Sequence, residues 1–313
     1  MAAGHLATRK AVGTMESPLV VGVDGSDASL TALDWAVDEA VRHALPLRIV
    51  HASMWERYEG VVPAWTTDRP SGQVLAENIA GTAAERARRR APDLPLTTDV
   101  LAEDAATALL REGLGGTILV VGSRGRGEFA DLLLGSVGLI VAARAHCPVV
   151  VVRGDRQALE ARHGRVLLGV GEHDLDSPAV RFAFREAAVR DAELDVVRTW
   201  RRQAHEPADH LLMRRAGAAY FTEGASELLE KALEAAASEH PHVRLRRSTV
   251  EGPAHRVLTE RSAAADLLVV GARRRDALVG LELGRVAHRA LHHASCPVAV
   301  VPQRRPVTTE GDQ

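Results

Sequence analysis

The chain is poor in lysine, cysteine and aromatic residues, and each shortage excludes a class of protein. Among its 313 residues are 39 lysines and arginines together, yet the lysines are only Lys10 and Lys231. Neither lysine follows a glycine, so the chain has no P-loop of the kind that binds phosphate through a Gly-Lys pair. Schiff-base chemistry is disfavoured for the same reason. Aromatic residues make up 3% of the chain, which leaves few stacking platforms for single-stranded nucleic acid.

Charge and hydropathy exclude two further classes of partner. The formal net charge is −2, without the basic surplus typical of nucleic-acid binders. No run reaches the ~20 apolar residues that a membrane-spanning helix needs. Residues 1–16 lack the apolar centre of a signal peptide. We therefore expect a cytoplasmic protein that binds neither a membrane nor nucleic acid.

The two cysteines reveal an internal duplication. Cys147 and Cys296 lie about half a chain apart, in the matching phrases Ala-His-Cys-Pro-Val-Val-Val and Ala-Ser-Cys-Pro-Val-Ala-Val. In the same register Thr117–Val152 aligns without a gap with Asp266–Val301. The apolar setting predicts two buried thiols rather than a disulfide or a catalytic cysteine.

Each copy alternates predicted strands with predicted helices. Continuous runs of valine, isoleucine and leucine indicate strands buried on both faces. In the first copy these are Leu19–Val23, Leu47–His51, Leu96–Leu101, Ile118–Gly122 and the strand after Cys147. In the second copy they are Val166–Val170, Leu194–Val197, Val243–Val250, Leu267–Gly271 and the strand after Cys296. The alanine-rich stretches between them predict helices at Ser29–Arg42, Ala76–Arg90, Ala105–Arg111, Val137–Ala145, Pro178–Arg190, Ser226–Glu239 and Ala254–Ser262. Such alternation predicts parallel sheets with helices on both faces.

These elements divide the chain into two domains and three connecting or terminal segments. We expect an N-terminal tail at 1–16, a first domain at 17–153, a linker at 154–163, a second domain at 164–303 and a C-terminal tail at 304–313. Ser53–Gly72 is predicted to be a long loop, either a flap over a site or a plain surface excursion.

Glycines after a buried strand form the most informative motif. Gly122 and Gly125 follow the strand directly, and Gly135-Ser136 opens an apolar helix. Glycines at this edge of a parallel sheet let the backbone approach a phosphate, and a helix N-terminus attracts an anion. The alternative interpretation is a glycine turn followed by a serine N-cap.

Asp24 follows the first strand and is predicted to face the same crevice. Its carboxylate could accept a hydrogen bond from an adenine amino group or a ribose hydroxyl. The alternative is a carboxylate that caps a helix or closes a turn. The sequence here is not the GxGxxG of a dinucleotide-binding fold.

Together these residues resemble the universal stress protein family. The spacing of Gly122, Gly125 and Gly135-Ser136 is similar to the nucleotide-binding motif of that family, and so are Val-Val-Gly-Val-Asp24-Gly-Ser, Val50-His51-Ala52 and the closing Cys-Pro-Val-Val-Val. The resemblance is strong over 17–153 and degenerate over 164–302. It implies an α/β protein of two Rossmann-like, adenine nucleotide alpha hydrolase-like domains, each a five-stranded parallel sheet flanked by helices. It also implies ATP as the ligand. Mg²⁺ could bridge the phosphates of ATP, although the sequence shows no dedicated ligand for the ion.

The resemblance assigns roles to ten residues of the first domain. Val23, Asp24 and Ala52 would hold the adenine, Val121 and Gly122 would line the adenosine, and Arg124, Gly125, Gly135, Ser136 and Val137 would surround the phosphates. No residue is assigned to catalysis or to metal binding.

The second copy departs from the motif. Gly271 and Gly284 keep their places, but Arg274 replaces the second glycine, Arg285 replaces the serine and Gly171 stands where the first copy has Asp24. We expect this domain to be a structural or regulatory partner, paired with the first about a pseudo-two-fold axis through the two Cys-Pro-Val strands. A further homodimer stays open.

Three weaker patterns have plainer explanations. His288 and His292 have zinc-like i, i+4 spacing without the glutamate of HExxH, so we interpret them as neighbours of a helix C-terminus. Glu172-His173-Asp174 is interpreted as a polar turn and Arg86–Arg90 as an exposed helix end.

The function expected from the sequence is an ATP-binding stress-response or regulatory protein. The first domain would hold the nucleotide without efficient turnover, because no catalytic lysine and no water-activating carboxylate is apparent. The alternatives are a weak ATP hydrolase or nucleotidyl-transfer enzyme on the same fold, and an interaction protein that binds no nucleotide.

Overall fold

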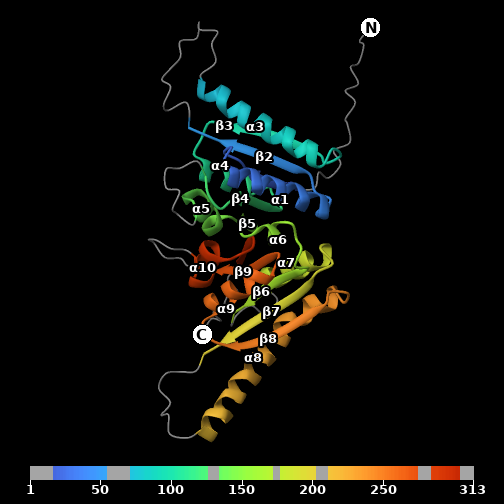
Figure 1. The fold of residues 1–313 in the computed structure, drawn as a ribbon, viewed down its shortest axis with the longest axis vertical. Coiled ribbons are helices and arrows are strands. Elements are labelled where there is room, and N and C mark those ends of the chain that lie inside the picture. The colour runs from blue at the N-terminus through green and yellow to red at the C-terminus, as the bar shows by residue number, and fades with distance from the viewer. Residues whose placement is uncertain are drawn as a thin grey trace, which may run out of the picture.

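The fold alternates strands and helices through both halves of the chain (Figure 1). The computed structural model describes residues 17–54, 71–125, 134–171, 177–201, 211–273 and 283–303, with the backbone alone at 211–221 and 273. The strands are β1 (Leu19–Gly22), β2 (Leu47–Ala52), β3 (Leu96–Leu101), β4 (Ile118–Gly122), β5 (Val149–Val152), β6 (Arg165–Val170), β7 (Glu193–Trp200), β8 (Leu245–Glu251), β9 (Leu267–Arg273) and β10 (Val298–Gln303). The helices are α1 (Asp27–His43), α3 (Ser71–Arg90), α4 (Ala105–Glu112), α5 (Ser136–Arg144), α6 (Arg156–Leu159), α7 (Pro178–Val189), α8 (Leu211–Glu239), α9 (Ala254–Arg261), the 3-10 turn η1 (Ser262–Ala264) and α10 (Arg285–His293).

The strands form one sheet of ten, in the order β3-β2-β1-β4-β5-β10-β9-β6-β7-β8. Every pairing within a half is parallel, which confirms the expected pair of five-stranded parallel sheets. The halves meet where β5 and β10 pair antiparallel, with Ala299 opposite Val150. In Figure 1 the blue and green half therefore continues into the yellow and red half without a break in the sheet.

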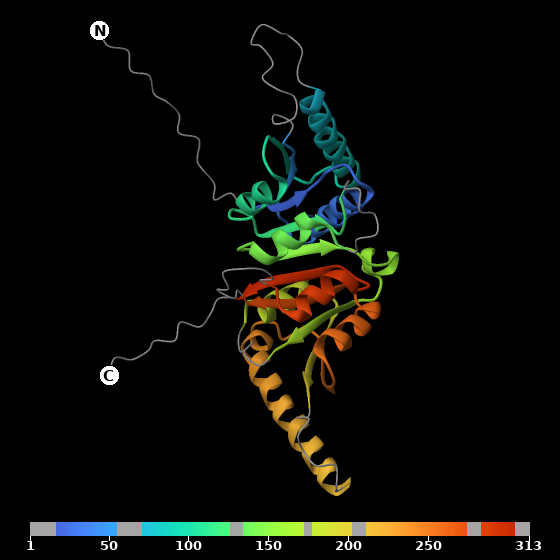
Figure 2. The same ribbon diagram turned by 90° about the vertical axis from the view of Figure 1, so that its left-hand side faces the viewer.

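Helices cover both faces of this sheet, because successive side chains of a strand point to opposite sides. Leu19 and Val21 of β1 belong to a core shared with α1, α3, α7 and α8. Val20, between them, belongs to a second core shared with α4, α5, α9 and α10. Figure 2, turned by 90°, shows the sheet between its two layers of helices. Because both faces are buried, the strands consist of continuous apolar runs, as the sequence indicated.

The segment between the two halves is packed against the second half. Asp155 caps the short α6 by accepting a hydrogen bond from the Ala158 amide at 2.9 Å, and Ala158 is buried. Gly154 has a φ of 103°. A Cβ atom at Gly154 would lie 2.2 Å from the Ser295 carbonyl oxygen, so only glycine allows the chain to cross here.

Helices α8 and α3 both begin earlier in the chain than the sequence predicted. α8 runs from Leu211 to Glu239, 29 residues, and begins well before the expected Ser226. No helix in the described part of the chain, α8 included, is long and apolar enough to cross a membrane. Of the expected loop 53–72, residues 55–70 lie outside the described residues, and α3 begins at Ser71.

The arginine run at the end of α3 binds the neighbouring helix α1. Arg86 donates two hydrogen bonds to Asp34, at 2.7 and 2.6 Å. Arg90 does the same to Asp38, at 2.6 and 2.6 Å. Both arginines remain more than two-fifths exposed. The run is thus an exposed helix end, as expected, in which Arg86 and Arg90 are paired with acidic residues of α1.

Candidate functional site

A pocket of about 910 Å³ lies at the carboxyl ends of β1 and β4. The chain leaves β1 toward β2 and β3 and returns to the other side of β1 to form β4. This reversal of strand order opens a crevice where ligands of parallel α/β sheets bind. The volume is within the ~300–1,000 Å³ of small-molecule sites.

All ten residues assigned from the sequence line this one pocket. They are Val23, Asp24, Ala52, Val121, Gly122, Arg124, Gly125, Gly135, Ser136 and Val137. The ends of β1, β2 and β4 carry the first five, the loop after β4 carries Arg124 and Gly125, and the start of α5 carries the last three.

Asp24 closes the turn between β1 and α1 and also faces the glycine loop. Its Oδ1 accepts hydrogen bonds from the Ser26 amide at 3.0 Å and from the Ser26 hydroxyl at 2.6 Å. Its Oδ2 would lie 2.6 Å from a Cβ atom placed on Gly125. One oxygen therefore serves the turn, as the alternative interpretation proposed, while the other points toward the loop.

The backbone of Val23 is held by β2. Its amide donates to the Val50 carbonyl at 2.9 Å. Its carbonyl oxygen lies 2.7 Å from Nδ1 of the buried His51. Since the amide is engaged, Val23 can offer a ligand only its carbonyl oxygen and its side chain.

Gly122 allows α1 to reach the edge of the pocket. A Cβ atom on Gly122 would lie 2.8 Å from both the carbonyl carbon and the oxygen of Ala28. These are backbone atoms of the first turn of α1, and Ala28 itself lines the pocket. The glycine therefore brings a helix N-terminus, with its unpaired N–H groups, to the strand end.

The second helix N-terminus at the pocket belongs to α5. Gly135 is its N-cap, in an extended conformation, and Ser136 is its first helical residue. The Gly135 amide donates to the Ser123 carbonyl at 2.8 Å, which fixes the helix start against the loop after β4. The alternative of a serine N-cap is therefore wrong at this position, because glycine occupies it.

Sequence reasoning missed the pocket residues that come from α1 and α4. Ser26, Asp27, Ala28 and Ser29 surround the start of α1, and Ala105 and Leu109 belong to α4; Gly22, Val50 and Gly138 complete the lining. Ser26 is the N-cap of α1 and accepts a hydrogen bond from the Ser29 amide at 3.3 Å. These residues could have been predicted, because the helix that follows each strand of a parallel sheet begins at the carboxyl end of that strand. Its N-terminus therefore lies at the edge of the sheet where the pocket is.

The second half differs at the position of the glycine loop. β4 ends at Gly122, whereas β9 continues past Gly271 to Arg273, paired with Pro302 and Gln303 of β10. The Gln303 amide nitrogen lies 2.2 Å from where a Cβ atom on Gly271 would be. The strand and this side chain occupy the place where the first half turns into its loop.

Two further positions of the second half are changed. α7 begins at Pro178, which aligns with Thr31, so α7 starts one turn later than α1 does in the register of the duplication. Arg198 stands in place of His51 and donates to the Gly171 carbonyl at 2.8 Å. Gly284 and Arg285 occupy the first positions of α10 as Gly135 and Ser136 do in α5. Arg274 and Glu172–Asp174 lie outside the described residues.

Both cysteines are free and buried, as predicted. Burial raises the pKa of the Cys147 thiol to about 11 and raises the pKa of Cys296 further. Neither is therefore a ready nucleophile at neutral pH. The rings of His288 and His292 have centroids 4.5 Å apart. Of these two, only His292 lies in the last turn of α10, whereas His288 lies in the first, so the expected position beside the helix C-terminus holds for one of the two. Among the residues that the structure describes, the group with metal-ligand geometry is Glu39, His43 and Glu186, away from the pocket.

Comparison with known proteins decides the family. The model of the Universal stress protein family matches twice, at residues 15–153 and 163–302. The chain belongs to the universal stress protein family. Universal stress protein Rv2005c of Mycobacterium tuberculosis is 31% identical over 298 residues, which cover 91% of this chain and 97% of that protein. The alignment with this relative therefore extends across both matched regions.

Solved structures show the same fold. A universal stress protein from Archaeoglobus fulgidus matches with a TM-score of 0.62 and 16% identity, over 92% of this chain and 98% of that one. A universal stress protein solved in complex with cAMP covers 44% of this chain and 97% of its own, at 28% identity and a TM-score of 0.34. The first comparison supports the two-domain architecture, and the second records a family member with an adenine nucleotide bound.

Proposed function

We propose that the first half of the chain binds ATP in the pocket at β1 and β4, and that the protein acts as a stress-response regulator. The observation that carries this proposal is the convergence of two helix N-termini, those of α1 and α5, on one pocket beside a glycine loop. Unpaired N–H groups and the positive ends of two helix dipoles suit the phosphates of a nucleotide. Arg124 adds a positive side chain to the lining.

The residues of the pocket fit an adenine nucleotide. Gly125 leaves open the space that a Cβ atom would fill beside Asp24, so a phosphate can approach the backbone there. The carboxylate of Asp24 and the carbonyl of Val23 can accept hydrogen bonds from the adenine amino group or the ribose. Asp24 and Asp27 are the carboxylates of the described lining, and carboxylate oxygens are the ligands Mg²⁺ takes beside phosphates.

The same lining supports a proposal of binding without efficient turnover. No lysine or histidine is among the described lining residues, and the Asp24 Oδ1 atom is held by Ser26. A hydrolase needs a group that positions or deprotonates the attacking water. We therefore propose that ATP acts as a bound ligand rather than a consumed substrate.

The second half has a structural or regulatory role in this proposal. The place of its glycine loop is taken by the longer β9 and by Gln303. Its last strand, β10, covers the edge of β5. We propose that the two domains pair about a pseudo-two-fold axis, in the cytoplasm, with a homodimer of such chains as a further step.

The first test is the nucleotide content of the purified protein. After denaturation, chromatography is expected to show close to one adenine nucleotide per chain. Two nucleotides of similar affinity per chain would contradict the role given to the second half. Protein without nucleotide and without calorimetric ATP binding would favour the pure interaction protein, and steady release of ADP or AMP would favour the enzyme.

The second test is a pair of matched glycine variants. Gly125→Arg is expected to weaken ATP binding at least tenfold, about 1.4 kcal/mol, because the new side chain meets Asp24 and enters the loop. Gly115→Arg is the control, since a Cβ atom there meets nothing within 4 Å. Titration calorimetry measures both, with circular dichroism to confirm folding. Equal affinity of the two folded variants would remove the loop from the site.

A further inference from the structure

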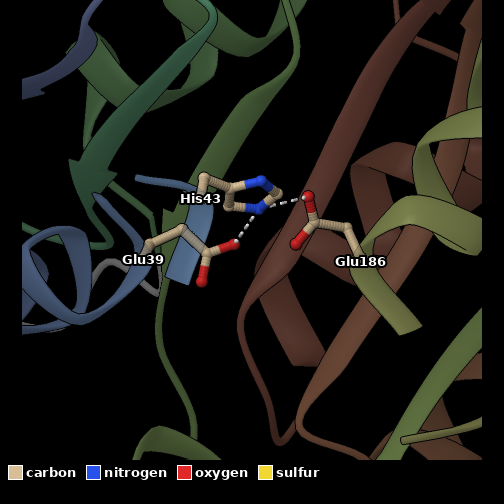
Figure 3. Close-up of side chains that lie close together, drawn as sticks. All are labelled: Glu39, His43 and Glu186. Carbon is tan, nitrogen blue, oxygen red and sulfur yellow. Dashed lines mark ion pairs between the residues drawn. The ribbon is translucent and has the colours of Figure 1, made fainter. Parts of the chain in front are cut away.

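Four ionisable side chains meet where α1 of the first half approaches α7 of the second. Glu39 and His43 lie on α1, and Glu186 and Arg190 lie on or just after α7. Both carboxylates are fully buried, and the side chains of His43 and Arg190 are 9% and 4% exposed. Figure 3 shows the His43 ring between the two carboxylates, one from each half.

The cluster repeats the same two helix positions in both copies. Glu39 aligns with Glu186 in the register of the duplication, and each has a basic residue four positions later, His43 in one copy and Arg190 in the other. Each base contacts the carboxylate of its own helix and that of the other helix. The contact is therefore reciprocal, as at a two-fold axis, except that one base titrates near neutral pH and the other does not.

Arg190 donates hydrogen bonds to both carboxylates. Its Nη2 donates to Glu39 Oε1 at 2.8 Å and to Glu39 Oε2 at 2.7 Å, and its Nη1 donates to Glu186 Oε2. Arg42, 27% exposed, also reaches Glu39 Oε2 at 2.9 Å. Glu39 therefore has two guanidinium partners. Burial raises the pKa of its carboxyl, but the charge of Arg190 and the hydrogen bond from His43 hold that pKa well below the usual range.

His43 is the partner of the remaining carboxylate oxygen. Its Nε2 lies 3.2 Å from Glu186 Oε1 and 3.3 Å from Glu39 Oε1. Glu186 Oε1 is buried and has no aligned hydrogen bond among the described residues, so the His43 ion pair is what offsets its burial. A neutral His43 would leave this oxygen without a positive neighbour at that position, which is costly in a buried site.

We infer that one proton, shared between His43 and Glu186, ties the two halves of the chain together and that the junction loosens when this proton leaves. Among the described residues, His43 contacts Glu39 of its own helix and Glu186 of the other half. Arg42 and Arg190 bind these same carboxylates. A divalent cation could use the same three ligand atoms. Because the guanidinium of Arg190 already binds both carboxylates, we assign this position to a proton on His43 rather than to a divalent cation.

The pH window follows from the direction of the shift. Burial opposes the charged form of His43, but the two carboxylates overcome it and raise its pKa from 6.5 to about 9. The pKa of Glu186 is also raised, by burial and by the charge of Glu39. A raised pKa in the folded state gives stability that is fully present below the unfolded value, here 6.5, and is lost as pH rises through about 9.

The test compares melting temperatures of the full chain between pH 6 and 10. We expect His43→Gln to melt roughly 3–6 °C below the unchanged protein at pH 6.5, and the difference to close by pH 10. His242→Gln, at an exposed position, is the control and should follow the unchanged protein throughout. A difference that stays constant with pH would overturn the inference.

A direct titration keeps the inference testable if His43→Gln does not fold. By NMR of histidine-labelled unchanged protein, the His43 ring should titrate well above 7, and Glu186→Gln should move that midpoint down toward 6.5. A His43 midpoint near 6.5 in the unchanged protein would overturn the inference. So would a melting temperature that rises with added Zn²⁺ or falls with EDTA, since that would assign the site to a cation.

Discussion

Gly122 illustrates how one residue can fix the geometry of a site at the scale of a single side chain. Its missing Cβ atom allows Ala28 of α1 to approach within the space a methyl group would need. Gly125 serves a different purpose, because the group its Cβ atom would meet is the Asp24 carboxylate rather than backbone. Within one motif, Gly122 thus permits close packing of the scaffold, and Gly125 permits a ligand to approach the backbone.

This difference predicts a stability effect at Gly122. Gly122→Ala is expected to lower the free energy of unfolding by about 1–3 kcal/mol, because the backbone of α1 must move. Gly115→Ala, with open space around it, should stay within about 0.5 kcal/mol of the unchanged protein. Urea unfolding followed by circular dichroism measures both. An unchanged free energy of unfolding in Gly122→Ala would mean that α1 can move away from the new methyl group without cost.

The sequence predicted the residues of the pocket better than those of the junction. Asp24 and the glycines could be found because their chemistry is local, a carboxylate or a missing side chain directly after a strand. The Glu39–Glu186 cluster and the position of the Gln303 side chain over Gly271 depend on how distant segments of the chain pack against each other. No local pattern carries that information, so these contacts required the structure.

Among the elements, α1 connects three parts of the molecule: the pocket, the neighbouring helix α3 and the second half of the chain. Its first turn lines the pocket, its middle binds α3 through Asp34 and Asp38, and its last turns hold the junction with the second half. The strands and the central helices were predicted closely from periodicity. The start of α7 at Pro178 was predicted as well. The short α6 was not, because it is set by a capping residue, Asp155.

The contact between α1 and α3 predicts a salt-sensitive coupling. A double-mutant cycle with Arg86→Gln and Asp34→Asn should show about 0.5–1 kcal/mol of coupling, since the pair is bidentate yet partly exposed. Arg256 and Glu260, a more exposed pair on one helix, should show a smaller coupling, because solvent screens it more strongly. Thermal unfolding at low and high salt measures both cycles. Coupling that does not fall in high salt would exclude an electrostatic origin.

For the whole molecule, the antiparallel seam of β5 and β10 makes the two halves one sheet. Parallel pairing ends at β5 in one half and at β10 in the other, and each covers the edge that its partner would expose. Pro302 lies in β10 beyond the residues that pair with β5, where a missing N–H group does not interrupt the seam. The duplication thus contributes a shared core as well as a second domain.

The continuous sheet predicts a single unfolding transition for the full chain. Calorimetry should show one cooperative peak, because the seam and the core cross between the halves. Ala299→Pro, opposite Val150, should cost about 3 kcal/mol or more by removing a ladder hydrogen bond. Ala299→Gly should cost about 1 kcal/mol, which separates pairing from packing. Two well-separated peaks in the unchanged protein would show that the halves unfold independently.

The seam also has a consequence for synthesis on the ribosome. β5 consists of four valines that are at most 2% exposed in the finished protein. The strand that covers them, β10, is made about 150 residues later, which at roughly 5–20 residues per second leaves the edge open for about 8–30 s. During that time the first half displays an uncovered valine strand to other nascent chains. We expect this interval, more than the stability of the finished sheet, to determine how much of the protein needs a chaperone.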